Sequence, residues 1–298
     1  MLVQLAGKIR PNPYGPDTVG TNFGLHFTGG EPFLNYELLR TAVETAHDLQ
    51  IPSLFVETNC YWCIDDKVTE EKLHDLKGRG LKGILISVNP FYLEYVPFER
   101  TERAIRISLE VFGENVMVYQ LEYYKRFKAM GIEGRVALED YLGNLEKRDY
   151  LIRNVEFFVT GRAAYKLQAK LGELFPRFPA NHFFSEPCRP SFLRNWHNHF
   201  DNYGNYVPGY CGGISLGDCR ELDKLLNEGI RLEEYPLLQF LMNEDLKGLF
   251  QFSEDFGYRE RREGYLSKCH LCIDVRKHLA GKEQFKELRP TEFYSHLE

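Results

Sequence analysis

His26-Phe27-Thr28-Gly29-Gly30-Glu31-Pro32 is the stretch that decides the fold of this chain. It follows a short apolar run at residues 23–27 and precedes a helix signal that starts near residue 35. This order predicts a β-to-α turn, because glycines adopt backbone angles closed to other residues and proline ends a strand. We expect the Glu31 carboxylate to lie above the strand end, where it suits a ligand ammonium. A tight turn without a ligand is the plain alternative.

Strand and helix signals alternate downstream of this turn. Strands are predicted at residues 53–58, 83–88, 116–119 and 155–160, and helices at residues 34–49, from residue 69, and at 101–112. Apolar runs of this kind are typical of parallel strands covered on both faces. The alternation therefore predicts an α/β fold with a parallel sheet or barrel. Ahead of it, residues 2–9 are predicted to end a helix and residues 11–22 to form a loop.

Composition bounds the class of protein. The 298 residues are 43% hydrophobic and 14% aromatic, which allows one large α/β domain plus a smaller module. A net charge of −6 argues against a general nucleic-acid or anionic-membrane surface. We find no signal peptide at the amino end and no apolar run long enough to span a membrane. A cytoplasmic location is predicted, where the seven cysteines are thiols or metal ligands.

The character of the chain changes at Phe175-Pro-Arg-Phe-Pro179, where the alternation stops and cysteines become frequent. We therefore predict two domains, residues 1–177 and 178–298. In the second, residues 201–211 predict a β-hairpin. Four thiolates fit either an iron–sulfur cluster or structural zinc, and the candidate ligands are Cys188, Cys211, Cys269 and Cys272, with Cys219 as a spare for Cys188.

Residues 28–32 resemble the GGEP motif of radical S-adenosylmethionine (SAM) enzymes, and the resemblance covers about residues 24–159. It implies a partial (β/α)6 TIM-like barrel in which Gly29, Gly30, Glu31 and Pro32 hold the amino group of SAM. The polar residues that follow the next two strands would then face the carboxylate and ribose of SAM, namely Asn59, Ser87 and Asn89. Helix capping and turn formation are the alternative role of these three side chains.

The C-terminal third is similar to the twitch or SPASM module that many radical SAM enzymes carry. That resemblance implies an auxiliary [4Fe–4S] cluster on the four cysteines, although the spacing from Gly204 to Cys211 is looser than the usual pattern and a full SPASM module has further cysteines after Cys272. It also implies a peptide or protein as a possible substrate, and a flavodoxin or ferredoxin as the electron donor of an active enzyme.

The chain departs from the family at one point. Radical SAM enzymes hold the catalytic cluster on a Cys-x3-Cys-x2-Cys loop ahead of GGEP, and no cysteine precedes Cys60 here. We expect that loop, with the first barrel strand, in a segment upstream of Met1. No catalytic residue is assigned. The alternative from another class is a non-catalytic iron–sulfur or zinc protein that keeps the barrel to bind a partner or nucleotide.

Two further motifs leave alternatives open. Cys60-Tyr-Trp-Cys63 supplies two ligands, too few for zinc or a cluster; it is a redox pair, a hydrogen-atom donor, part of a larger site or simply two loop thiols. Trp196-His-Asn-His199 contains the letters of the HNH nuclease motif without its spaced metal ligands. We interpret these histidines as surface or packing residues.

Overall fold

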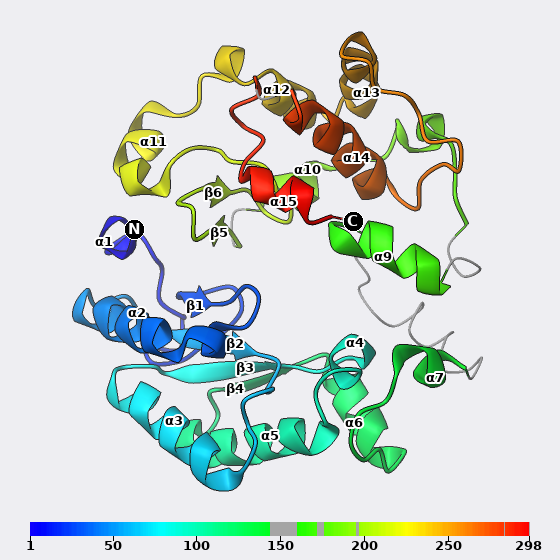
Figure 1. Ribbon diagram of the computed structural model, residues 1–298. Helices are drawn as coiled ribbons and strands as arrows, with labels where there is room; N and C mark the ends of the chain where they lie inside the picture. Colours follow the sequence, from blue (N-terminus) through cyan, green and yellow to red (C-terminus); the bar gives the residue numbers. More distant parts are fainter. Residues whose placement is uncertain (144–159, 172–175, 195–196, 283, 298) are drawn as a thin grey trace. The chain divides into compact units, whose positions relative to one another are not determined.

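The computed structural model of this chain describes residues 1–143, 160–171, 176–194, 197–282 and 284–297 (Figure 1). Contacts divide the chain into two compact units, Leu2–Val155 and Glu156–Glu298, with Met1 assigned to the second. We call them the N-terminal unit and the C-terminal unit and describe each by itself. In the described residues, no helix is both long enough and apolar enough to cross a lipid bilayer.

The N-terminal unit contains a four-stranded parallel sheet. Its strands follow one another in sequence order, with β1 and β4 at the edges: β1 (His26–Phe27), β2 (Phe55–Thr58), β3 (Gly83–Ser87) and β4 (Val116–Tyr119). The α/β class and the parallel sheet are as predicted. Four strands in one sheet do not make the predicted barrel, and the strand expected at residues 155–160 falls mostly on positions outside the described residues.

β1 is shorter than the predicted strand at residues 23–27 because the backbone bends at Gly24. Its φ of 80° lies in the left-handed region, and a Cβ there would come within 2.3 Å of the Ser53 carbonyl oxygen. Only glycine allows the two segments to approach so closely. Hydrogen bonding to β2 therefore begins at Leu25, the residue before β1, whose carbonyl accepts a hydrogen bond from Phe55 N at 3.1 Å.

Helices cover one face of this sheet. α3 and α5 lie side by side along it in Figure 1, and α5 contacts β3 and β4. The helical segments of this unit are α1 (Leu2–Leu5), the 3₁₀ helix η1 (Pro32–Asn35), α2 (Tyr36–Asp48), α3 (Asp66–Gly78), α4 (Pro90–Leu93), α5 (Phe98–Phe112), α6 (Leu121–Ala129) and α7 (Leu138–Leu142).

Two of these helices begin earlier than predicted, at local signals. Asp65, rather than Thr69, caps α3, since its carboxylate accepts a hydrogen bond from Val68 N at 2.7 Å. α5 begins at Phe98, directly after Pro97, and ends at Gly113 as predicted.

The loop before β1 packs on an apolar cluster of the sheet. Val19 lies against Phe55 and Leu85, with Met117 beside them. Side chains alternate along a strand, so the fully buried Ile84 and Ile86 project from the opposite face to Leu85. Apolar side chains therefore project from both faces of the sheet, and the polar side chains gather at the carboxyl ends of the strands.

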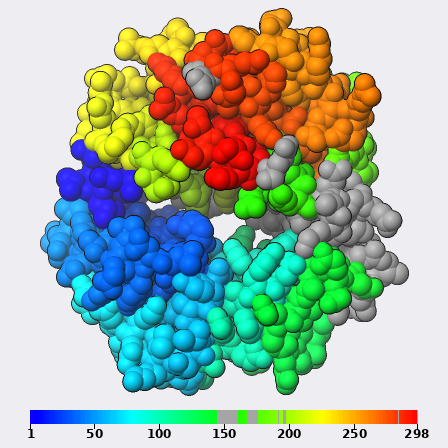
Figure 2. Space-filling view, viewed as in Figure 1, coloured from blue at the N-terminus to red at the C-terminus, as the bar shows by residue number. Residues whose placement is uncertain are grey.

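The C-terminal unit is mostly short helices around one hydrophobic core. Its elements are α9 (Arg162–Leu171), η2 (Ala180–Phe183), α10 (Arg189–Phe192), β5 (His199–Phe200), β6 (Tyr206–Val207), η3 (Cys219–Glu221), α11 (Leu222–Glu228), η4 (Leu232–Glu234), α12 (Pro236–Met242), α13 (Leu246–Asp255), α14 (Lys268–Ala280) and α15 (Thr291–Ser295). α14 supplies the centre of the core, where Leu271, Val275 and Leu279 are fully buried. Figure 2 shows the orange and red segments, α13 to α15, packed against one another.

The predicted hairpin is present as β5 paired antiparallel with β6. Asp201 shapes its turn, because Oδ1 accepts hydrogen bonds from Tyr203 N at 2.9 Å and Asn205 N at 2.8 Å. The units divide at residues 155/156, ahead of the predicted boundary at 177/178. α9 belongs to the C-terminal unit, where Tyr165 OH donates to Asp274 Oδ1 at 3.0 Å.

Candidate functional site

The glycine pair lies at the carboxyl end of β1, as predicted. Gly29 and Gly30 have φ of 86° and 56°, both left-handed, and both are exposed. A Cβ at either position would meet no atom within 4 Å, so backbone conformation, rather than space, requires glycine there. Pro32 begins η1. The turn therefore presents bare backbone at the end of the first strand.

Glu31 directs its carboxylate into the protein. Oε2 accepts a hydrogen bond from Asn59 N at 2.7 Å, and Oε1 accepts from Thr58 Oγ1 at 2.9 Å and Phe33 N at 3.3 Å. The residue is 8% exposed, and this burial raises the pKa of its carboxyl despite the three hydrogen bonds. The side chain thus links the ends of β1 and β2. The sequence predicted instead that the carboxylate would point towards a ligand.

Glu57 is a carboxylate at this edge that sequence reasoning did not single out. Its Oε2 accepts from Thr28 Oγ1 at 2.7 Å and its Oε1 from Ser87 Oγ at 2.8 Å, which links the ends of three adjacent strands. The sequence did contain a signal for Glu57. Side chains alternate between the two faces of a strand, so Glu57 lies on the same face of β2 as Phe55, two residues before it. We call Thr28, Glu57 and Ser87 the polar row of the sheet; Glu57, at its centre, is half-buried.

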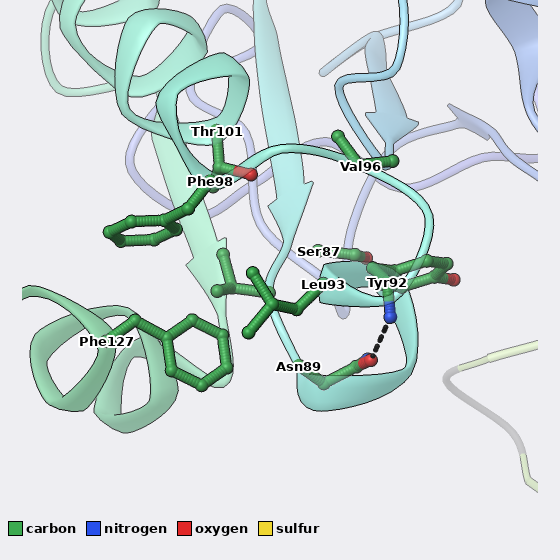
Figure 3. A pocket seen from close by; sticks show the side chains of 9 residues that line it. Ser87, Asn89, Tyr92, Leu93, Val96, Phe98, Thr101 and Phe127 are labelled. Atoms are coloured by element: carbon green, nitrogen blue, oxygen red, sulfur yellow. Dashed lines mark hydrogen bonds between the residues drawn. The ribbon is translucent and has the colours of Figure 1, made fainter. Parts of the chain in front are cut away.

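Asn59 and Asn89 act as caps. Asn59 Oδ1 accepts from Tyr61 N at 3.0 Å, while Asn89 Oδ1 accepts from Phe91 N at 3.0 Å and Tyr92 N at 3.1 Å at the start of α4 (Figure 3). Their side-chain oxygens therefore have the capping or turn role that was the alternative to ligand binding. The side-chain amino groups of the two residues are the atoms that can contact a ligand.

A small cavity lies beside these residues. Ser87, Asn89, Tyr92, Leu93 and Phe127 are among its lining side chains (Figure 3), and its volume is about 10 Å³. That space admits about one water molecule. A nucleoside therefore does not fit inside it, and a ligand at this edge would lie over the strand ends.

Cys60 and Cys63 are both fully buried in the loop after β2. Cys60 has a left-handed φ of 67°, and its thiol lies within hydrogen-bonding reach of the Cys63 thiol. Burial, together with the neighbouring Cys63, raises the pKa of Cys60 well above its ordinary value. Cys60 is therefore a thiol at neutral pH, which disfavours nucleophilic chemistry at this residue.

The four predicted ligands of the C-terminal unit line one cavity, of about 60 Å³. Cys188 directly precedes α10, and Cys211 follows the hairpin. Cys269 and Cys272 stand three residues apart in the first turns of α14, which places them on one side of the helix. The proposed spare, Cys219, is buried in η3 and is not among the residues that line this cavity.

The loop that carries Cys211 depends on glycine. Cys211 N donates to Pro208 O at 3.0 Å, which closes a turn. Gly213 then adopts φ of 78°, and a Cβ on it would lie 2.3 Å from Phe293 Cδ1. The loop can pack against α15 only because Gly213 has no side chain.

In the metal-free protein, burial raises the pKa of three of these cysteines, Cys188, Cys211 and Cys269, and so favours their thiol form. Burial raises the pKa of Cys211 to about 12 and that of Cys188 to about 11. A metal would have to displace their protons, so binding would release protons and weaken at low pH. All seven cysteines of the chain are free of disulfides.

The four thiols surround a cavity without converging on a point. Among the described residues, no group of three or more His, Cys, Asp or Glu side chains is placed to hold a metal ion. A single zinc ion needs its four sulfurs at about 2.3 Å from one centre. A cubane instead binds one thiolate at each iron, at four separated corners.

The two histidines of residues 196–199 form a local pair. His197 Nε2 lies 3.2 Å from His199 Nε2, and His199 Nδ1 is 2.9 Å from the Gly209 carbonyl oxygen. Both residues are half-buried.

No protein-family model matches this chain, and the search of curated proteins found no significant match.

Proposed function

We propose that this chain is a radical SAM protein whose C-terminal unit binds an auxiliary [4Fe–4S] cluster through Cys188, Cys211, Cys269 and Cys272. One observation carries the proposal: four cysteines from three separate parts of the sequence line the same cavity. Burying thiols together gives no stabilisation that apolar side chains would not give, whereas it provides four ligands for a metal cluster.

The N-terminal unit supports the SAM half of the proposal. Its parallel sheet ends in an exposed glycine turn, next to a carboxylate that joins three strands. The Glu57 carboxylate has about four lone-pair sites, and two hydroxyls occupy two of them. The remaining sites can accept hydrogen bonds from an ammonium or from ribose hydroxyls, both of which SAM carries.

In radical SAM enzymes, SAM cleaved at a reduced cluster supplies a radical that abstracts hydrogen from the substrate. The printed sequence contains no Cys-x3-Cys-x2-Cys motif, so that step needs cysteines from elsewhere. For this chain the proposal concerns SAM binding and the auxiliary cluster. A peptide or protein substrate and a flavodoxin or ferredoxin donor follow from the resemblance alone and stay predictions.

Anaerobic reconstitution with iron and sulfide tests the cluster. We expect about four irons per chain, and loss of most of this iron in Cys269→Ser and Cys272→Ser. Cys219→Ser is the matched control, since Cys219 is buried in the same unit away from the cavity. Its iron content should equal that of the wild type. Iron and acid-labile sulfide per chain are the measurements.

Two results would contradict the cluster assignment. One is zinc without iron in protein purified anaerobically from iron-replete cells, combined with failed reconstitution, which would favour structural zinc. The other is equal loss of iron in Cys219→Ser and Cys272→Ser.

Equilibrium binding of radiolabelled SAM to the reconstituted protein tests the other half. Glu57→Gln removes the charge, while its amide oxygen still accepts from one of the Thr28 and Ser87 hydroxyls and its amino group can donate to the other. We therefore expect the fold to persist and affinity to fall about tenfold, or ~1.4 kcal/mol. Glu37→Gln on the exposed face of α2 is the control. Cluster binding without saturable SAM binding would favour the non-catalytic metal protein.

A further inference from the structure

Arg276 is a buried cation in the wall of the cysteine cavity. It lies on α14, one turn after Cys272, and is 2% exposed. A guanidinium stays charged at every physiological pH. Removing it from water costs several kcal/mol unless an anion accompanies it, so its surroundings should reveal that anion.

The described surroundings contain only neutral partners. Arg276 Nη1 donates to the Gly212 carbonyl oxygen at 2.9 Å and to Tyr294 OH at 3.0 Å. Tyr294 OH in turn donates to the Gly213 carbonyl at 2.5 Å. Of the residues that the structure describes, no Asp or Glu forms an ion pair with Arg276, and its Nε–H has no hydrogen-bond partner. Other arginines of this unit, such as Arg261, pair with carboxylates.

Glu186 lines the same cavity, but the ionisable thiols that interact with Arg276 itself are cysteines. Cys272 and Cys211 both interact electrostatically with its guanidinium. As protonated thiols they leave the cation without a counter-charge. As four thiolates around a [4Fe–4S]²⁺ core they would give a group with a net charge of about −2. Arg276 offsets part of that charge from the buried side of the wall, and Lys268 lines the same cavity.

We propose that Arg276 is the built-in counter-cation of the anionic cluster in this cavity and sets its reduction potential. This inference rests on the proposed function. Adding an electron makes the cluster more negative, so a nearby fixed cation favours the reduced state. Hydrogen bonds to cluster sulfurs act in the same direction, and the Nε–H is the donor available for one. Arg276 is a positioning residue, because it acts on the potential of the cluster and touches no substrate.

Anaerobic redox titration of the reconstituted full chain, followed by electron paramagnetic resonance of the reduced cluster, tests the inference. We expect Arg276→Gln to lower the midpoint potential and Arg276→Lys, which keeps the charge, to restore most of it. Arg177→Gln is the matched control, because Arg177 is a half-buried arginine of the same unit that pairs with Glu263. Its potential should equal that of the wild type. An unchanged potential in Arg276→Gln, at wild-type iron content, would overturn the inference.

A second measurement tests the inference if Arg276→Gln binds less cluster than the wild type. The counter-cation role predicts that cluster loading raises the unfolding temperature less in Arg276→Gln than in the wild type, since the loaded state alone contains the anion. If Arg276 only tied the Gly212 loop to α15, the loaded and metal-free forms would lose stability equally, and an unchanged gap would overturn the inference. Absence of iron from the wild type, by contrast, contradicts the proposed function itself before any Arg276 variant is measured.

Discussion

Glu31 is the residue for which sequence and structure suggest different roles. An acid after a glycine pair at a strand end matches a ligand-binding motif, yet its carboxylate accepts hydrogen bonds from Asn59 N, Thr58 Oγ1 and Phe33 N. No feature of the sequence indicates this, because the partners at the end of β2 come close only once β1 and β2 pair. Any contact with a ligand ammonium would add to these bonds.

The raised pKa of Glu31 predicts a pH dependence of stability. The folded protein binds this proton more tightly than the unfolded chain, so the contribution is full below the ordinary pKa of 4.5 and is lost as pH rises through the higher folded pKa. We therefore expect the unfolding free energy of the wild type, minus that of Glu31→Gln, to fall as pH rises above the ordinary pKa of 4.5. Urea denaturation at several pH values measures it, and a difference that rises with pH would contradict the assignment.

At the scale of elements, the parallel strands could be predicted better than the helix starts: α2 begins at the predicted position, after Asn35, whereas α3 and α5 begin earlier than predicted. Apolar runs in the sequence locate β2, β3 and β4 to within two residues at each end. Helix starts depend on which of several polar residues caps the first turn, and Asp65 competes successfully with Thr69 for α3. The short helices α11 to α13 escaped prediction, because packing in the core rather than length or periodicity stabilises them.

The two candidate sites differ in how far sequence could locate them. The four cysteines could be grouped in advance, because cysteine spacing is itself a signal for metal ligands. Alternation along β2 indicates only the face on which Glu57 lies. Its partners Thr28 and Ser87 could not be predicted, since they lie on neighbouring strands whose register is set only on folding. Arg276 likewise looks in the sequence like any other charged residue of a helix.

At the scale of the whole molecule, each unit has a core of its own. The C-terminal core centres on α14, whose Leu271, Val275 and Leu279 are fully buried in one cluster with side chains of α12 and α13. The same helix carries two of the four candidate ligands and Arg276. The candidate metal ligands and the core of the C-terminal unit therefore share one helix, while the polar row around Glu57 belongs to the sheet of the other unit.

This division predicts where cluster loading changes local stability. A ligand that binds only the folded state stabilises the structure that holds it, so amide hydrogen exchange in α14 and the Cys211 loop should slow by about tenfold or more on loading. Exchange in α3 and α5, which cover the parallel sheet, should stay unchanged. Mass spectrometry of peptides from loaded and metal-free full chain measures both regions, and Cys272→Ser, treated with iron and sulfide in the same way, is the control. Equal slowing in α3, α5 and α14 would show instead that the two units respond to the metal as one.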